Sequence, residues 1–290
     1  LGTWRGQLVA AGGFTALGGV SARGIAAWDG ATWRALGEGV GVLGYDAVPR
    51  CVAEFQGDLV VGGASLFAPG MSPDGVLRWD GSAWRTMGSG LDGTVSALLA
   101  FHGRLYATGS FNAGYDSTAV LAEWNGTDWR LIGGGAIPRG AGYSLAVFRD
   151  SLYMGGSFSS SAGPFSRAPL WRWDGADGFA GVPALGGSVY ALAAFQDRLY
   201  AGGDVVLNGV HGRDELAAWD GTAWSRPAGG VRYRSPTSDV VVIGEVRALR
   251  EIAGRLFVTG EFDSAGGQAA TARSRMLSDG SGTMERSVAS

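Results

Sequence analysis

Lysine is absent from this chain of 290 residues, because all 23 basic residues are arginine. A phosphate-binding P-loop, a Schiff base and a lysine general base all need that side chain, so these three kinds of chemistry are excluded. Cysteine occurs once, as Cys51, which excludes an internal disulfide framework. Histidine occurs twice, as His102 and His211, and these two with one cysteine do not make a zinc or copper site. We therefore expect neither a metal nor another cofactor.

Long apolar runs and strong net charge are missing too. No apolar stretch approaches the roughly 18 residues of a membrane-spanning helix, so we expect no membrane-spanning segment. The net charge is -3 and the sequence pI is about 5.4, which does not favour nucleic acid as a partner. Hydrophobic residues make up 46% of the chain and charged residues only 17%, as expected for a globular protein.

What the sequence does have is a repeated tripeptide, Trp-Asp-Gly or once Trp-Asn-Gly, followed closely by a second aromatic residue. The five copies are Trp28-Asp29-Gly30 with Trp33, Trp79-Asp80-Gly81 with Trp84, Trp124-Asn125-Gly126 with Trp129, Trp173-Asp174-Gly175 with Phe179, and Trp219-Asp220-Gly221 with Trp224. Their starts lie 51, 45, 49 and 46 residues apart. A regular period of about 20–50 residues indicates a repeat architecture. Residues present in every copy therefore serve to build the repeat.

Each repeat is predicted to form four short strands. In residues 94–133, a first strand ends at Phe101, and residues 104–111, 119–126 and 128–133 follow as further strands. Asn-Gly or Asp-Gly between apolar runs is a strong hairpin signal, since both residues tolerate positive φ. Four strands in a unit of about 48 residues are typical of a propeller blade. The sequence therefore predicts an all-β, six-bladed β-propeller as a single domain over residues 1–290.

Six copies of the second strand support this count. They are predicted at residues 8–14, 59–64, 105–111, 152–158, 199–204 and 256–262, in repeats of approximately 1–40, 41–90, 91–135, 136–186, 187–230 and 231–290. The sixth copy lacks the tryptophan pair, and the first begins within its first strand at Leu1. Either these two copies complete each other or the chain is a fragment. Cys51 is expected at a repeated leucine position, as a small buried hydrophobe and not a nucleophile.

The pattern resembles the kelch-type repeat of the galactose oxidase and kelch superfamily of β-propellers. That repeat has a hydrophobic strand ending in a glycine doublet, then a tyrosine-led strand, then a tryptophan. The doublets here are Gly12-Gly13, Gly62-Gly63, Gly155-Gly156 and Gly202-Gly203, with Thr108-Gly109 and Thr259-Gly260 in two repeats. The resemblance covers essentially the whole chain and implies the propeller fold. It implies no function, because propellers host binding, scaffolding and catalysis alike.

Candidate site residues lie in the connections that depart from the repeat. Second-to-third and fourth-to-next-first connections share one face of a four-stranded blade array, and variable loops on a rigid scaffold are where function is usually placed. The candidate binding residues are Tyr45, Asp46, Phe67, Met71, Arg139, His211, Arg213, Asp214, Arg232, Tyr233 and Arg234. The run Arg232-Tyr233-Arg234 has the composition of an interface hot spot and equally suits stacking against a sugar.

The sequence favours a non-enzymatic binding or structural module, with a protein or a glycan as the partner on the long-loop face. Repeat regularity and the lack of a catalytic constellation lead to that hypothesis. One alternative is a carbohydrate-active enzyme with its site at the central channel mouth, which predicts two carboxylates there. Another is an accessory subunit of a larger assembly, which predicts an apolar patch around Phe67 and Met71. The Trp-Asp-Gly repeats resemble those of bacterial surface and secreted proteins, and this resemblance implies an extracellular or cell-envelope location.

Overall fold

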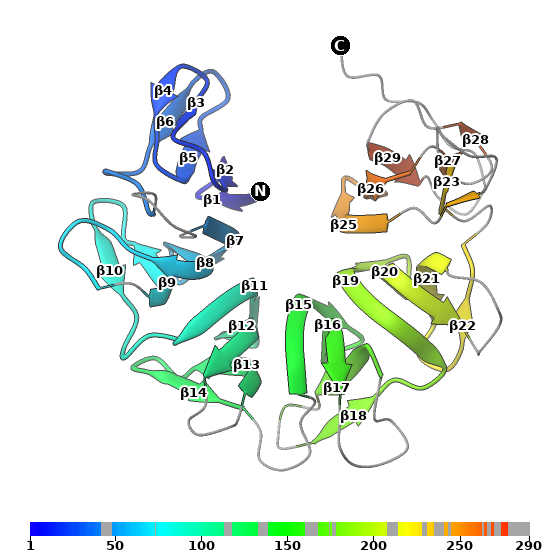
Figure 1. Cartoon of the computed structure of the whole chain (residues 1–290). Helices are drawn as coiled ribbons and strands as arrows, with labels where there is room; N and C mark the ends of the chain where they lie inside the picture. The colour runs from blue at the N-terminus through cyan, green and yellow to red at the C-terminus, as the bar shows by residue number, and fades with distance from the viewer. Residues whose placement is uncertain are drawn as a thin grey trace. The chain divides into compact units, whose positions relative to one another are not determined.

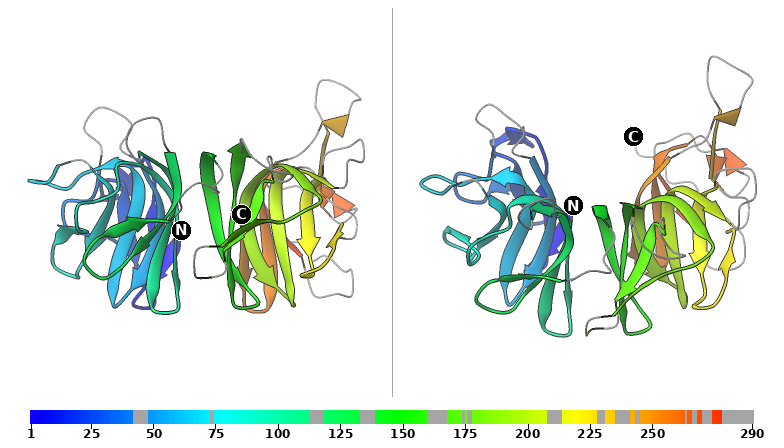
Figure 2. Two further views of the ribbon diagram at one scale, coloured as in Figure 1. Left: turned by 90° about the horizontal axis from the view of Figure 1, so that it is seen from below. Right: turned by 60° about the horizontal axis from the view of Figure 1, so that its bottom comes forward.

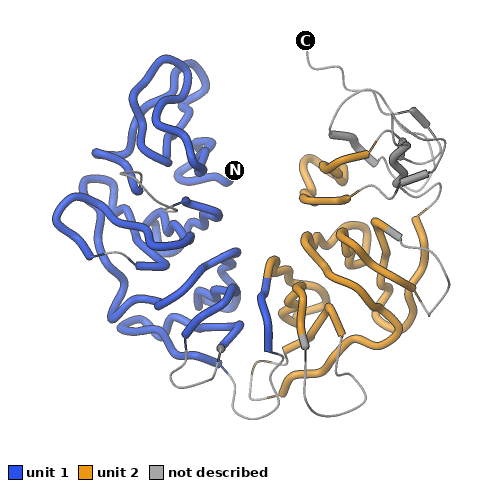
Figure 3. The backbone as a smooth tube through the Cα atoms, viewed as in Figure 1, with its two compact units in different colours: residues 1–142 blue, residues 143–290 orange. Residues whose placement is uncertain are grey.

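The chain consists of two compact units, residues 1–142 and residues 143–290 (Figure 3). The computed structural model describes residues 1–41, 48–72, 74–112, 118–132, 139–159, 168–173, 175, 178–207, 214–227, 231–234, 241–242, 245–262, 264–265, 268–269 and 274–277. Within these residues every regular element is a β-strand, which confirms the all-β prediction. Three predicted repeats fall in each unit.

Unit 1 contains a four-stranded antiparallel sheet and an eight-stranded one, whose two groups of four strands are joined only where Thr94 pairs with Ala64 (Figure 1). We call each group of four strands a sheet. The first is β1 (Gly2–Trp4), β2 (Gln7–Ala11), β5 (Ile25–Trp28) and β6 (Trp33–Ala35), with a small hairpin of β3 (Ala16–Leu17) and β4 (Val20–Ser21) between β2 and β5. The second is β7 (Val48–Phe55), β8 (Asp58–Leu66), β9 (Asp74–Trp79) and β10 (Trp84–Thr86). The third is β11 (Gly93–Phe101), β12 (Arg104–Asn112), β13 (Thr118–Trp124) and β14 (Trp129–Leu131).

Unit 2 continues the same pattern, after β15 crosses the boundary between the units. Its four-stranded sheets are β15 (Arg139–Phe148), β16 (Ser151–Ser159), β17 (Leu170–Trp173) and β18 (Phe179–Gly181), then β19 (Leu185–Phe195), β20 (Arg198–Leu207), β21 (Asp214–Trp219) and β22 (Trp224–Ser225). The last sheet has three strands, β25 (Glu245–Ile252), β26 (Arg255–Glu261) and β29 (Ser274–Leu277). A small sheet of β23 (Val231–Arg234), β24 (Val241–Val242), β27 (Ser264–Ala265) and β28 (Gln268–Ala269) lies in the irregular connections.

Consecutive antiparallel strands place alternate connections at opposite ends of each sheet. The first-to-second and third-to-fourth connections are tight turns, and we call this end of a unit the turn end. The second-to-third connections and those leading to the next sheet are longer, and we call the opposite end the loop end. Figure 2 shows the two ends of each unit from the side. The predicted division of short turns and long loops between two faces therefore holds within each unit.

The core of each unit lies between consecutive sheets. An aromatic residue near the end of one first strand shares a buried cluster with a leucine near the start of the next sheet's second strand. The pairs are Trp4 with Leu59, Phe55 with Leu105, Phe148 with Leu199, and Phe195 with Leu256. This recurrence explains why the sequence repeats these two residue types, since each sheet buries its face only against the next one.

The glycine doublets lie opposite an irregularity in the adjoining first strand. The register between β19 and β20 shifts between Val189 and Ala191, opposite Gly202-Gly203. A Cβ atom on Gly203 would lie 2.3 Å from the carbonyl oxygen of Ser188, so a larger residue would collide with backbone there. The pairs β7–β8, β11–β12 and β25–β26 show the same shift. The doublet is therefore the partner of a β-bulge.

A side chain from the next sheet also packs against the first glycine of a doublet. A Cβ atom on this glycine would lie 2.4–2.5 Å from a valine Cγ1, in the pairs Gly62 with Val95, Gly155 with Val189, and Gly202 with Val246. At the contact between the third and fourth sheets, the positions of the larger and the smaller residue are exchanged. Thr108 stands at the glycine position, and Gly142 stands at the valine position, where a Cβ atom would lie 1.8 Å from the Thr108 Oγ1. The hydroxyl of Thr108 donates a hydrogen bond of 2.6 Å to the Val120 carbonyl.

The register of Cys51 differs from the prediction. Cys51 pairs with Gly62, as Ala191 pairs with Gly202, and Val52 follows in the repeated leucine position. The sequence already shows this offset, because Cys51 lies four residues before Phe55, whereas a repeated leucine such as Leu192 lies three residues before its aromatic residue, Phe195. Burial raises the pKa of the Cys51 thiol to about 12. The thiol therefore behaves as a packing group, as predicted, although from a neighbouring position.

The first glycine doublet is also displaced by one residue. Ala11 pairs with Ile25 in the same way that Gly62 pairs with Val76, so Ala11 and not Gly12 takes the first doublet position. Cβ atoms on Gly12 and Gly13 would make only ordinary contacts, the nearest at 3.7 and 3.9 Å. Assigning Gly12-Gly13 as an equivalent doublet was therefore wrong.

The Trp-Asp-Gly repeat forms the turn between the third and fourth strands. Oδ1 of Asp220 accepts hydrogen bonds of 2.8 Å from the backbone N–H groups of Thr222 and Ala223. Asp29, Asp80 and Asn125 accept the equivalent pair of bonds in their own turns. The flanking tryptophans pair across the strands, with ring centroids 5.2 Å apart for Trp219 and Trp224. In these four copies the motif is therefore structural, as its repetition predicted, and Asp174 of the fifth lies outside the described residues.

Candidate functional site

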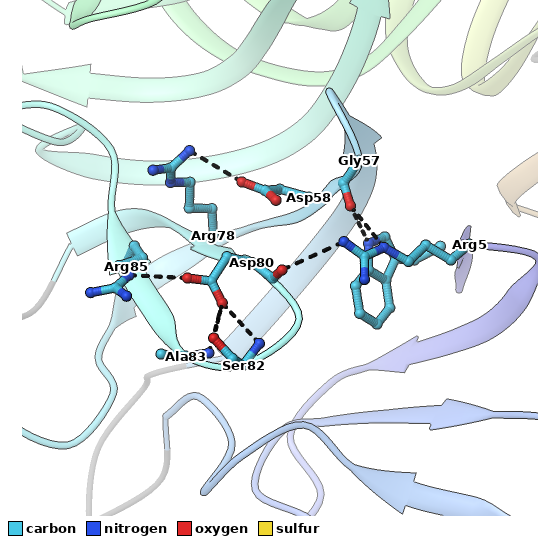
Figure 4. Close-up of polar contacts among 9 residues, drawn as sticks. Arg5, Gly57, Asp58, Arg78, Asp80, Ser82, Ala83 and Arg85 are labelled. Carbon is cyan, nitrogen blue, oxygen red and sulfur yellow. Dashed lines mark hydrogen bonds and ion pairs between the residues drawn. The ribbon is translucent and has the colours of Figure 1, made fainter.

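The polar groups of the turn end are largely bonded to one another. Asp80 illustrates this in Figure 4, where Oδ1 accepts the Ser82 hydroxyl at 2.7 Å and Oδ2 accepts Nε of Arg85 at 3.1 Å. Beside it, Nη1 of Arg78 forms an ion pair of 3.1 Å with Asp58. Hydrogen bonds, first from Ser82 and Ala83, hold the pKa of Asp80 well below its usual range. These side chains stabilise the turns.

Two arginines of the turn end also connect neighbouring sheets. Arg5 stacks over the Trp4 ring at 4.7 Å and donates from Nε to the Gly57 carbonyl at 3.1 Å in the next sheet's turn (Figure 4). Arg149 has the same position in unit 2. It donates through Nε and Nη2 to the two carboxylate oxygens of Asp197, at 3.0 and 2.6 Å. This fork-shaped pairing lowers the pKa of Asp197. We find no candidate ligand site at this end among the described residues.

The loop end of unit 1 contains a cavity of about 310 Å³ between two connections of the second sheet. It is bounded by the β8–β9 connection on one side and by the β10–β11 connection on the other. Its lining residues are Ser65, Ser72, Asp74, Gly75, Thr86, Gly88, Ser89, Leu91, Asp92 and Gly93. The lining thus contains four hydroxyls and two carboxylates and no basic side chain, so it favours a ligand that donates hydrogen bonds.

Asp74 is the most firmly held polar side chain of the cavity. Its Oδ1 accepts backbone hydrogen bonds from Leu91 at 2.8 Å and from Val76 at 3.2 Å. The Gly75 N–H donates to the Leu91 carbonyl at 3.0 Å, which ties the two connections together. Burial raises the pKa of Asp74, although the backbone hydrogen bonds favour the charged form, and nearby Asp92 raises it further. Asp74 is therefore a positioned acceptor whose proton affinity is above the ordinary value.

Ser65 adds a strained backbone conformation to the cavity wall. Its φ is +47°, within a strand and away from the tight turns where most of the other positive-φ residues other than glycine occur. The register of β8 against β9 shifts between Gly62 and Leu66, so Ser65 lies in the irregular part of the strand. A serine in this conformation costs about 1 kcal/mol or more, and such strain is concentrated at functional sites. The Ser65 side chain is exposed at the cavity.

Asp92 and Ser89 form the other wall. Oδ2 of Asp92 accepts a hydrogen bond of 3.0 Å from Nδ2 of Asn112, and the Asp92 carbonyl accepts the Asn112 N–H at 2.9 Å. Ser89 donates its N–H and its hydroxyl to Oδ1 of Asp128, at 2.9 and 2.7 Å. The third sheet thus holds this wall in position from behind. Both carboxylates of the cavity are anchored by one oxygen.

The residues predicted to bind a ligand are not brought together within the described part of the chain. Tyr45, Asp46, His211 and Arg213 lie outside the described residues. Arg232, Tyr233 and Arg234 lie in β23 and Asp214 begins β21, with only the backbone described. Arg139 is exposed at the start of β15. Phe67 is half-buried and Met71 packs against the core cluster of the first two sheets. Their binding roles remain predictions.

Sequence reasoning did not single out Asp74 and Asp92. The loop 64–75 departs from the repeat, but its apolar residues Phe67 and Met71 are the more conspicuous ones in the sequence. Both aspartates are followed by glycine, as are the aspartates of the repeated turns. A distinguishing signal was present, because neither Asp74 nor Asp92 follows a tryptophan.

Among the described residues, no group of three or more His, Cys, Asp or Glu side chains is arranged to hold a metal ion. In the same residues, no helix has the length and apolar character needed to cross a membrane.

Comparison with known proteins adds little. No protein-family description matches the chain, and no curated protein matches it either. A solved structure, described as "Structure of YjhT", is 15% identical to this chain, with a TM-score of 0.49 and 89% of each chain covered. At that level the likeness carries no argument about function.

Proposed function

We propose that the six sheets are the blades of a kelch-like, six-bladed propeller in which the first and last sheets complete each other. Exposure at two repeated positions supports this. Leu59, Leu105, Leu152, Leu199 and Leu256 are at most 1% exposed, whereas the equivalent Leu8 is 38% exposed. Trp4, Phe55, Phe148 and Phe195 are at most 9% exposed, whereas the equivalent Ile252 is 52% exposed. Each terminal sheet thus lacks one of the partners that cover the other sheets.

We propose further that the protein is a non-enzymatic binding module that takes a sugar unit of a glycan in the cavity at the loop end of unit 1. The observation that carries this proposal is the lining of the cavity, with hydroxyls and two anchored carboxylates and no basic residue. Carboxylates held by one oxygen offer the other to sugar hydroxyls. The volume of about 310 Å³ is at the lower end of the roughly 300–1,000 Å³ usual for small-molecule sites.

A second candidate function is glycoside hydrolysis at the same cavity. Two carboxyl groups line it, and burial raises the pKa of Asp74. A carboxyl group with a raised pKa beside a second carboxylate is the arrangement from which glycosidases obtain their acid and base. We favour binding, since Oδ1 of Asp74 receives two backbone hydrogen bonds that stabilise its charged form.

Incubation with a panel of polysaccharides, scored for both retention and cleavage, tests both candidates. We expect retention without cleavage, and we expect Asp74→Asn to weaken retention about tenfold through loss of a charged acceptor. The matched control is Asp150→Asn at the turn end, where φ is +57° and asparagine is well tolerated. Cleavage that disappears in Asp74→Asn would establish the enzyme instead. Unchanged retention in Asp74→Asn would reject this cavity as the site.

A further inference from the structure

Three successive first strands of unit 2 carry unusual residues at one repeated position. Residues 140–148, 187–195 and 244–252 align as GAGYSLAVF, GSVYALAAF and GEVRALREI, which places Tyr143, Tyr190 and Arg247 in register. Tyr190 and Arg247 are the extra residues where the register of β19 and of β25 shifts against the second strand. Bulges redirect a side chain and are frequent beside binding sites. None of these residues is needed by the cavity of unit 1.

The two tyrosines lie against each other. Their ring centroids are 5.5 Å apart and the rings are inclined at 48°. Both side chains are half-buried, so part of each remains accessible. Tyr143 comes from β15 and Tyr190 from β19, so the pair bridges two consecutive sheets. Tilted aromatic rings of this kind present faces with negative electrostatic potential.

Carboxylates lie on the strands beside Tyr190. Glu245 lies opposite Glu261 in the β25–β26 ladder, and Asp204 lies opposite Ser188 in the β19–β20 ladder. Arg247 forms ion pairs with Glu245 at 2.7 Å and with Glu261 at 3.6 Å. Glu245 and Glu261 share the one guanidinium of Arg247, so these three side chains together carry an excess of one negative charge.

The neighbouring carboxylates also affect the ionisation of the Tyr190 hydroxyl. Burial raises the pKa of the Tyr190 hydroxyl, and the charges of Glu245 and Asp204 raise it further. The carboxylates are therefore close enough to influence the aromatic pair. β25 also lies beside β19, so Glu245 is on a strand next to that of Tyr190.

We propose that this surface, formed by Tyr143 and Tyr190 with Glu245, Glu261 and Asp204 beside them, binds an organic cation of the ammonium or guanidinium type. The aromatic faces attract a cation through their quadrupoles, and the excess carboxylates attract the same charge. An anion would be repelled by the carboxylates. A neutral sugar would gain the ring contact but not the charge attraction. The site is separate from the cavity of unit 1 and goes beyond the function proposed for it.

Isothermal titration with tetramethylammonium tests the proposal on the full chain, with tert-butanol as an uncharged probe of similar shape. We expect saturable binding of the cation, little binding of the alcohol, and weaker binding at high salt. Tyr190→Leu should weaken binding about fivefold, within the range of a cation–π contact. Tyr190→Phe, which keeps the ring, should remain close to the parent. Equal affinity for the alcohol, or no saturable heat, would overturn the proposal.

A matched pair of charge variants separates a local effect from a general one. Glu245→Gln should weaken tetramethylammonium binding several-fold, because one of the nearby carboxylates is lost. Glu251→Gln removes the same charge from the turn end of β25 and should leave affinity unchanged. Equal effects of both variants would refute a local site. Titration with an arginine-rich peptide against free tetramethylammonium then distinguishes a peptide side chain from a small free cation as the source. Asp74→Asn should leave all of these titrations unchanged.

Discussion

At the scale of single residues, the exchange of sizes at Thr108 and Gly142 shows how closely neighbouring sheets fit. Three junctions combine a glycine with a valine, and this one combines a threonine with a glycine. Thr108 is fully buried, and its hydroxyl is bonded to the Val120 carbonyl. Thr108 therefore fits its position, although three other sheets have glycine there. Thr108 occupies the space that a Cβ atom at position 142 would need, so it is compatible only with a glycine there.

The pair predicts strong non-additivity. Gly142→Val alone should destabilise the protein by about 2 kcal/mol, because the new side chain would overlap the Thr108 hydroxyl. Thr108→Gly alone should cost about 1–3 kcal/mol through lost packing and a more flexible strand. The double variant recreates the glycine–valine junction and should be within about 1 kcal/mol of the parent. Urea unfolding of the four proteins measures the coupling. Simple addition of the two single costs would contradict this account.

At the scale of elements, the third-to-fourth-strand turn should respond to acid. Hydrogen bonds from Ala223 and Thr222 lower the pKa of Asp220 from 3.8 to about 2. A carboxyl whose folded pKa is depressed contributes stability that is present above its unfolded pKa and lost as pH falls through the folded value. This contribution should therefore disappear between about pH 4 and pH 2.

Asp220→Asn tests that contribution, because Asn125 shows that asparagine forms the same two backbone bonds. We expect the variant to fold normally and to be somewhat less stable than the parent at pH 7, where the charged acceptor is lost. The difference in urea midpoint should shrink at pH 2.5, since Asp220 is then losing its charge in the parent. A difference in urea midpoint that stays constant across this pH range would show that the charge of Asp220 does not stabilise the turn.

Much of this level of organisation could be predicted from the sequence. The strand following each tight turn was located to within a few residues, because a leucine, alternating apolar residues and glycines mark it in every repeat. The bulge was not visible, because only pairing with the opposite strand reveals the extra residue. Cys51 was misplaced for another reason, since three residues before Phe55, where the repeat has its leucine, the sequence has Val52. Asp74, Asp92 and Ser65 were missed because connections without repetition come together only after folding. Tyr190 was missed because its position in the repeat looked structural.

At the scale of the whole molecule, the proposed closure can be tested with two cysteines. We expect Leu8→Cys with Ile252→Cys, in a Cys51→Ala background, to be joined within one chain by a short bismaleimide. Both positions are exposed in the present structure, so the substitutions themselves should be tolerated. Peptide mapping of the monomeric product measures the link, and each single cysteine variant is the control. Products that join only separate chains would indicate head-to-tail association and would contradict closure within one chain.

The junction of Thr108 with Gly142 has a consequence for how such a chain can change during evolution. A duplicated copy of a repeat with the glycine–valine pattern would meet compatible neighbours at other glycine–valine junctions. The third repeat presents a threonine, so it can precede only a repeat that offers a glycine, as the fourth does. Recombination between repeats is therefore tolerated at some boundaries and blocked at this one. The order of the third and fourth repeats is fixed by the volume of a single side chain.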